Sequence, residues 1–150
     1  MVATYVDAID TTALYIKVGN GAGPEVFEHP CLINTSRGVS FSADATAKVR
    51  NRCDDPTAPG KTVRTVVSTD STISGEGVLP AGSAKTYADW LRSGQPKNIT
   101  AQVGSAAGAL VVTGPYVLTE FSITGSDHGA DVTASISLAQ ADEPTITAKA

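Results

Sequence analysis

The chain has 150 residues, 41% of them hydrophobic, and a formal net charge of −4. This length suits one domain with its own core, and the acidic balance argues against a nucleic-acid-binding surface, which needs clustered Lys and Arg. Only 17% of the residues are charged, against about 25% in typical soluble domains. We therefore expect sheet faces that meet other sheets or subunits rather than bulk water.

The first half of the sequence predicts strands joined by turns. Residues 1–12 are expected to form an arm or an edge strand, and strands are expected over 13–18 and 26–35, with a glycine-rich turn between them. Residues 39–49 alternate between apolar and polar side chains, which indicates a half-buried strand. The prolines, glycine and mixed charges of residues 50–61 predict a projecting loop.

The next segment predicts one or two strands over 62–79, with a break near Gly75 and Gly77, and then a helix. Apolar residues recur at helical spacing, which indicates a helix over about 84–93. The apolar residues on one face of this helix are Ala84, Tyr87, Ala88 and Leu91. Ser83 is the expected N-cap and Gly94 the expected stop. Tyr87 and Trp90 are expected to pack in the core, and the alternative is a stacking platform for a ligand.

The last third predicts a closing hairpin. A strand is expected from residue 98 to 103, and residues 110–138 contain two strand patterns joined by a glycine-rich turn. In the second pattern, over 132–138, apolar residues alternate with Thr and Ser, so one face should be buried and the other polar but scarcely charged. Residues 140–150 are expected to form a tail.

No catalytic or cofactor-binding constellation is visible. The GKT sequence at 60–62 lacks the first glycine of a phosphate-binding loop and precedes a strand pattern instead of a helix. Ser126, Asp127 and His128 are adjacent in a predicted turn and cannot converge as a catalytic triad. We therefore expect no enzyme activity, no cofactor and no metal site. Cys31 and Cys53 are interpreted as reduced thiols, or as a disulfide formed within or between subunits after release from the cell.

Several motifs, taken in order, resemble those of the major tail proteins, or tail tube proteins, of bacteriophages and gene transfer agents. GVSFSADATAKV (38–49) ends an early hairpin and is followed by a proline-containing loop and STISGEGVL (71–79). A short helix with Tyr and Trp ends in SG at 93–94, and PKNITAQV and TGPYVLTEFSITGSDHGADVTASISLAQ follow. The resemblance covers residues 13–140.

The resemblance implies a mainly β fold, a sandwich or small barrel flanked by the one helix. Six copies would form a ring whose inner sheets join into one barrel, and rings would stack into a virion tail tube that delivers DNA to the host. The protein would be made in the bacterial cytoplasm, because the chain opens with acidic residues where a signal peptide needs basic ones. Its implied partners are copies of itself, a tape measure protein, a tail terminator, tail-tip or baseplate proteins and, in contractile tails, a sheath protein; DNA would pass without specific binding.

Within this expectation, the arm at 1–12, the loop at 50–61 and the tail at 140–150 are the expected bridges between subunits. The loop residues expected at intersubunit contacts are Arg50, Arg52, Asp54 and Asp55. The strand carboxylates expected to line the lumen are Asp44, Asp70, Glu76 and Glu120, and ordinary solvated carboxylates are the alternative for each. Two other classes remain open: a tube protein of the type VI secretion kind, and a secreted β-sandwich binding module.

Overall fold

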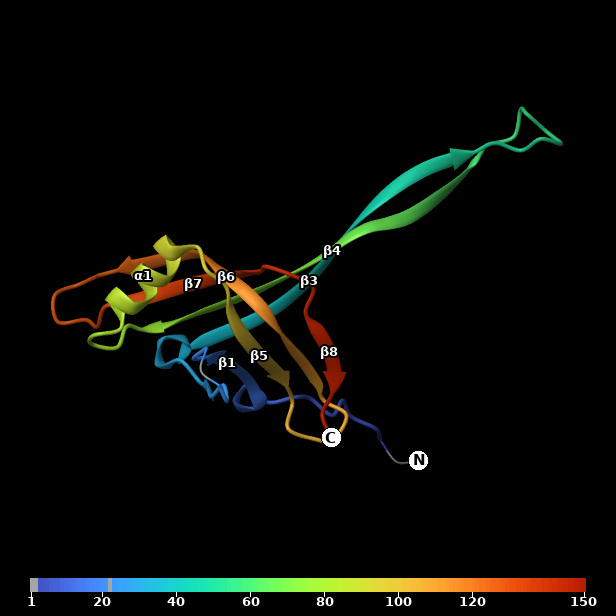
Figure 1. Ribbon diagram of the computed structural model, residues 1–150. Coiled ribbons are helices and arrows are strands. Elements are labelled where there is room, and N and C mark those ends of the chain that lie inside the picture. The colour runs from blue at the N-terminus through green and yellow to red at the C-terminus, as the bar shows by residue number, and fades with distance from the viewer. Residues whose placement is uncertain (1–2, 22) are drawn as a thin grey trace.

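The computed structural model describes residues 3–21 and 23–150, and the side chain of Cys31 lies outside the description. The strands are β1 (Leu14–Gly19), β2 (Phe27–Glu28), β3 (Ser36–Arg50), β4 (Lys61–Val78), β5 (Lys97–Val103), β6 (Leu110–Thr124), β7 (Thr133–Gln140) and β8 (Thr145–Ala148). The helical elements are α1 (Ala84–Ser93) and two 3₁₀ turns, η1 (Thr11–Ala13) and η2 (Cys31–Ile33). The predicted mainly β fold with one short helix is confirmed (Figure 1).

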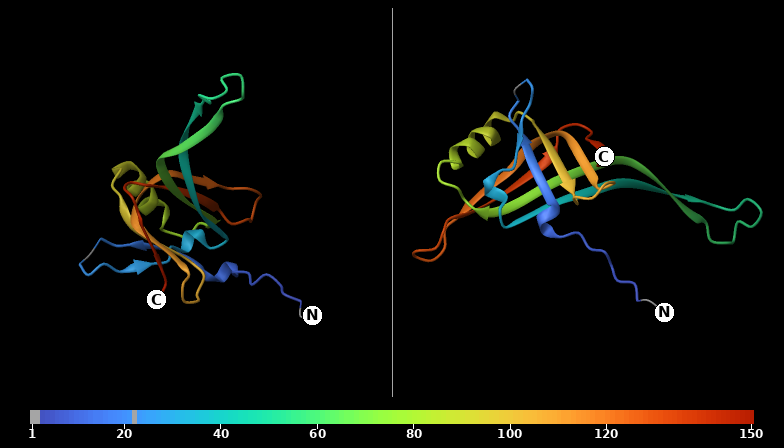
Figure 2. Two further views of the ribbon diagram at one scale, coloured as in Figure 1. Left: turned by 90° about the vertical axis from the view of Figure 1, so that its right-hand side faces the viewer. Right: turned by 90° about the horizontal axis from the view of Figure 1, so that it is seen from below.

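All eight strands belong to one antiparallel sheet in the order β2-β1-β5-β6-β7-β4-β3, with β8 pairing to β6. The sheet does not close into a barrel within one chain, because β2 and β3 at its two ends do not pair with each other in the described residues. Strand β6 links the two parts of the sheet: its first half pairs with β5 and β8, and its second half pairs with β7. Figure 2 shows β6 running from the part with β1 and β5 to the part with β4 and β7.

The core lies on one face of this sheet and draws on both of its parts. The largest fully buried apolar side chains are Tyr116, Ile16, Leu32, Ile33, Ile73, Ile99, Leu138 and Val112. Burial of each aliphatic side chain of this size contributes about 1.5–3 kcal/mol. The alternation expected for the closing hairpin is confirmed from residue 133 onward, because Ala134, Ile136 and Leu138 are buried while Thr133 is exposed. It is wrong for Val132, which precedes β7 and is exposed.

Helix α1 covers the core and ends as its sequence predicts. Gly94 adopts φ 66° in the left-handed region, which suits a residue without a Cβ. Trp90 is buried, with its Nε1–H donating to the Gln95 carbonyl oxygen at 2.8 Å, and the Tyr87 ring lies 5.6 Å from the Phe121 ring. Core packing of Trp90 is therefore confirmed. Ser83 occupies the N-cap position as predicted, although its side chain makes no capping hydrogen bond.

The strand expected over 26–35 is also wrong. Only Phe27–Glu28 pairs with β1, and Cys31–Ile33 form η2, which buries Leu32 and Ile33 against the sheet. The predicted break near Gly75 and Gly77 does not occur, because β4 runs unbroken past both. A Cβ on Gly75 would lie 2.7 Å from the Ile33 Cβ, and one on Gly77 would lie 2.9 Å from the Asn34 Cγ. These glycines permit η2 to approach the strand rather than ending it.

The two ends of the chain differ in structure. Residues 3–10 carry no regular structure and are exposed. Thr11 is held to the body by Arg37, whose guanidinium donates to the carbonyl oxygens of Thr11, at 3.0 Å, and Leu14. The predicted tail at 140–150 contains β8, which pairs with the first half of β6. It therefore adds a strand to the sheet.

Candidate assembly surfaces

The four carboxylates expected in the lumen lie on one face of the sheet. In the strand register Asp44 pairs with Ser68, Asp70 with Ser42, Glu76 with Ser36 and Glu120 with Ser137. Directly paired residues project to the same face, and successive residues along a strand alternate between faces. Because Ile73 and Leu138 occupy the core face, the four carboxylates share the opposite one.

We call this surface of β3, β4, β7 and the second half of β6 the acidic face. The remaining positions on it from residues 36–44, 68–78, 117–124 and 133–139 are Ser, Thr, Gly, Ala and Val, without Lys or Arg. Its four carboxylate residues are exposed, and the described residues provide no salt-bridge partner for any of them. The face is therefore polar, negatively charged and free of cations.

A β-bulge places one of these carboxylates. Leu118 projects into the core, and strict alternation would put Glu120 on the core face as well. The register between β6 and β7 shifts between Leu118 and Glu120, so Glu120 pairs with Ser137 and points outward. Its Oε1 accepts a hydrogen bond from the Ser122 hydroxyl at 3.2 Å.

Strands β3 and β4 extend beyond the sheet as a hairpin that projects from the rest of the molecule (Figure 1). Arg50 is the last residue of β3, and residues 51–60 form the tip of the hairpin, which contains Arg52, Asp54 and Asp55. All four loop residues expected at subunit contacts are exposed. The Arg52 Nε–H donates to Asp54 Oδ1 at 2.9 Å, which lowers the pKa of Asp54 and raises that of Arg52. The pKa of Asp55 is lowered by the Thr57 hydroxyl, 2.7 Å away. Arg52 and Asp54 thus neutralise each other.

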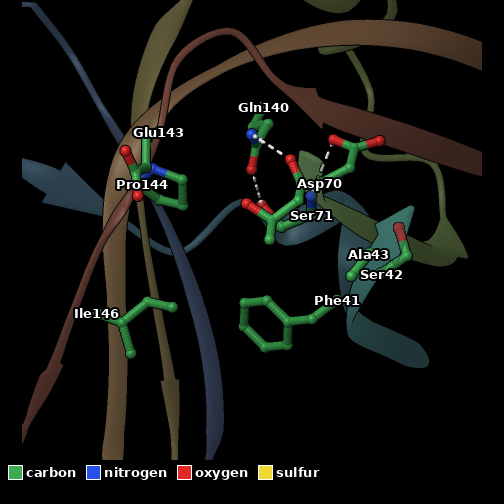
Figure 3. A pocket seen from close by; sticks show the side chains of 10 residues that line it. Phe41, Ser42, Ala43, Asp70, Ser71, Gln140, Glu143, Pro144 and Ile146 are labelled. Atoms are coloured by element: carbon green, nitrogen blue, oxygen red, sulfur yellow. Dashed lines mark hydrogen bonds between the residues drawn. The ribbon is translucent and has the colours of Figure 1, made fainter. Parts of the chain in front are cut away.

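An open apolar cleft of about 520 Å³ lies where the hairpin leaves the body, and no sequence pattern predicted it. Figure 3 shows Phe41 of β3 and Ile146 of β8 on opposite sides of this cleft, with Pro144 beside Ile146. Phe41 is 47% exposed and Ile146 55%. Exposed apolar patches of this kind are typical of surfaces that contact another protein.

The polar wall of the cleft is part of the core. Ser71 is buried, and its hydroxyl lies 2.8 Å from the Tyr116 hydroxyl and donates to Gln140 Oε1 at 2.8 Å. The Gln140 amide in turn donates to the Thr69 carbonyl oxygen at 3.3 Å. This network fixes the hairpin base against β6 and β7, and Figure 3 shows its part between Ser71 and Gln140.

Two strand edges along the acidic face carry no partner in the described residues. Strand β3 pairs only with β4, and residues 117–124 of β6 pair only with β7. The two edges flank the same four strands. An unpaired edge is a template for pairing with a strand of another chain.

Other residues singled out in the sequence form no site. Within residues 3–21 and 23–150, no group of three or more His, Cys, Asp or Glu side chains could hold a metal ion, and no helix is long and apolar enough to cross a membrane. Cys53 is an exposed free thiol at the hairpin tip, whereas η2, which contains Cys31, precedes the other end of β3. The side chain of Cys31 is outside the description, so a disulfide between the two cysteines stays a prediction.

These surfaces define a β-protein that presents free strand edges, a polar face and a projecting hairpin to other chains. Comparison with known proteins agrees with that class. The sequence model of the phage tail tube protein family matches residues 9–145, so the chain belongs to the phage tail tube protein family. No curated protein sequence matches the chain significantly.

Solved structures show the same fold. The tail of an empty gene transfer agent particle, refined with C6 symmetry, aligns with a TM-score of 0.73 at 19% identity, over 93% of this chain and 99% of that one. The SPP1 tail tube aligns with a TM-score of 0.62 at 13% identity, over 95% of this chain and 80% of that one. The tube–sheath complex of an extracellular contractile injection system, PVC, aligns with a TM-score of 0.62 at 15% identity, over 95% of this chain and 93% of that one. The protein is therefore a tail tube protein of the phage family.

Proposed function

We propose that six copies of the chain form a ring and that rings stack into a hollow tail tube through which DNA passes. The family assignment and the C6 symmetry of the similar gene transfer agent tail support six copies. The role is structural: the chain forms a wall and a passage and catalyses no reaction. Tubes of this kind also serve contractile injection systems, so a type VI-like tube is the second candidate, supported by the similarity to the PVC tube–sheath complex.

Ring closure follows from the two free edges. The outer edge of β3 of one copy would pair with residues 117–124 of β6 of the next, so that β3, β4, β7 and β6 of all copies form one continuous barrel. This pairing satisfies the backbone hydrogen-bonding groups of both edges. It also carries the acidic face around the ring as a single surface.

The observation that carries this proposal is the acidic face itself. DNA phosphates bind to clustered Lys and Arg by releasing counterions, and this face offers none. Four carboxylates per copy, on a background of Ser and Thr, would repel the phosphates and let the duplex slide. The acidic face would therefore line the lumen, with Asp44, Asp70, Glu76 and Glu120 directed at the DNA.

The projecting parts would connect neighbouring copies. We assign this role to the arm at 1–12, the hairpin tip at 50–61 and the tail at 140–150. Residues 3–10 of the arm carry no regular structure, the hairpin tip projects from the body (Figure 1), and β8 of the tail is a short strand paired to β6. The other proteins that would contact the tube are those expected for the family. They are a tape measure protein in the lumen, a terminator at one end, tip or baseplate proteins at the other, and a sheath in contractile tails. Production in the bacterial cytoplasm precedes assembly.

Retention of DNA by assembled tubes tests the lumen assignment. Tubes of the wild-type protein, seen by negative-stain electron microscopy, should not retain short duplex DNA on sedimentation. The variant E76K/E120K should form tubes that retain DNA at low salt and release it at high salt, because lysines would now line the passage. E28K/D89K, which makes the same change in net charge at exposed positions on β2 and α1, away from the acidic face and from the bridging segments, is the matched control. Equal retention by both variants, or wild-type protein that forms no tubes, would contradict the proposal.

A further inference from the structure

Charge is distributed very unevenly along the chain. Residues 48–64, the outer part of the hairpin, hold five of the 11 basic residues but only two of the 15 acidic ones, a net charge of +3. The rest of the chain carries six basic and thirteen acidic residues, a net charge of −7. The hairpin is thus a basic projection on an acidic body.

Within the hairpin, like charges stand directly opposite each other. Arg50 pairs with Lys61 in the strand register, and Lys48 lies two residues before Arg50 on the same face. Directly opposed like charges destabilise a strand pair. The described residues supply no salt bridge to any of the three, since the hairpin's one described salt bridge joins Arg52 to Asp54. We call Lys48, Arg50 and Lys61 the cationic hairpin face. An arrangement that is unfavourable in the isolated chain becomes favourable when an anionic group covers it.

A second copy of the chain offers such a group at its opposite end. The turn between β6 and β7, residues 125–132, contains Asp127 and Asp131 and no Lys or Arg. It is exposed and is closed by a hydrogen bond from the Ala130 N–H to the Asp127 carbonyl oxygen at 3.0 Å. Figure 1 shows this turn at one end of the molecule and the hairpin tip at the other. In a head-to-tail stack these two ends face each other.

We infer that the cationic hairpin face of each copy binds Asp127 and Asp131 of a copy in the adjacent ring. The inference rests on the proposed tube. It goes further by naming both sides of the ring-to-ring contact and its chemistry, a carboxylate–cation contact. Complementary charge of this kind gives specificity and direction, because two hairpins, or two turns, repel each other. Stacking is therefore polar, with every ring oriented the same way.

Salt provides the first test. Raising the ionic strength from about 0.1 M to about 1 M shortens the screening length from about 10 Å to about 3 Å. The critical concentration for tube formation, measured by light scattering and negative-stain microscopy, should rise at least about tenfold, equivalent to about 1.4 kcal/mol. A critical concentration that does not change with salt would overturn the inference while leaving the tube intact.

Charge exchange provides the second test. R50E/K61E and D127K/D131K should each fold, by circular dichroism and thermal unfolding, yet form no tubes. The combined variant R50E/K61E/D127K/D131K should form tubes again, because each interface then has complementary charges once more. K17E/R92E, which makes the same change in net charge outside the hairpin as R50E/K61E, should assemble like wild type.

The outcomes separate the two levels of the argument. Tubes from either double variant, or no recovery in a combined variant that folds, would overturn the inference alone. Wild-type protein that forms no tubes under any condition would contradict the proposed tube and this inference with it. Recovery by the combined variant would support both.

Discussion

Gly75 is the position where a single methyl group should be most costly. It lies in β4, where η2 crosses the core face, and an added Cβ would lie 2.7 Å from the Cβ of Ile33 and nearer still to its Cγ2. Ile33 is fully buried and β-branched, so its side chain cannot turn away. Gly75→Ala therefore forces η2 from the sheet, an overpacking that costs about 1–3 kcal/mol in typical cores.

We place Gly75→Ala in the upper half of that range, at about 2–3 kcal/mol, because backbone as well as side-chain atoms must move. For a chain of this length each kcal/mol lowers the melting temperature by about 2–4 °C, so a fall of about 4–12 °C is expected. Urea unfolding at protein concentrations below those of assembly, followed by the fluorescence of the single tryptophan, would measure the free energy of unfolding directly.

The same hairpin supplies the control. Gly38 pairs with Ser74 on the acidic face, and a Cβ there would meet only the Ser74 hydroxyl at 3.7 Å, an ordinary contact. Gly38→Ala should change the free energy of unfolding by no more than about 0.5 kcal/mol. If Gly75→Ala and Gly38→Ala were equally stable, the packing of η2 described here would be refuted.

Three further predictions concern the hairpin and its base. Ser71→Ala should cost about 1–3 kcal/mol in the free energy of unfolding, because it removes the partner of the buried Tyr116 hydroxyl. The double variant Ser71→Ala/Tyr116→Phe should recover part of that loss. A double variant as unstable as Ser71→Ala alone would argue against the network. Arg52 lowers the pKa of Asp54 below its ordinary value of 3.8. Their pairing therefore stabilises the tip at pH values above 3.8, and this stabilisation is lost as the pH falls through the lowered pKa. Arg52→Gln should return the Asp54 pKa toward 3.8, as measured by NMR titration, and an unchanged Asp54 pKa would contradict the pairing. Replacing residues 51–60 by Asn-Gly should leave the melting temperature within about 2 °C, because that segment is mostly exposed, yet abolish tubes in electron micrographs; normal tubes would show that the tip is not a bridge.

Local patterns were sufficient for much of the fold. Helical spacing from Ala84 to Leu91 and the glycine at 94 located α1 to the residue. Alternation over 132–138 identified the buried face of β7. These features depend on neighbours in sequence, where periodicity and backbone preference are decisive.

Tertiary contacts explain the failures. Leu32 and Ile33 sit in a segment whose composition suits a strand, but they form η2 because two glycines of β4 leave room for it. The same glycines suggested a break in β4, although their role is to allow close approach. Neither the 3₁₀ turn at η2 nor the unbroken course of β4 can be predicted without knowing that these two segments pack together.

The assembly surfaces were predictable only in part. The strand carboxylates were recognisable as candidates, but their common face depends on the register and on the bulge before Glu120, which sequence alternation alone does not reveal. The opposition of Arg50 and Lys61 likewise follows from pairing across a ten-residue loop. The apolar cleft brings together β3 and β8, which are about a hundred residues apart in the chain.

Cryo-electron microscopy of tubes assembled from the purified protein would test the central claim most directly. The account predicts hollow, six-fold tubes whose inner wall is a continuous barrel of β3, β4, β7 and β6, with Asp44, Asp70, Glu76 and Glu120 directed into the lumen. Tubes in which this acidic face points outward, or is buried between subunits, would contradict it.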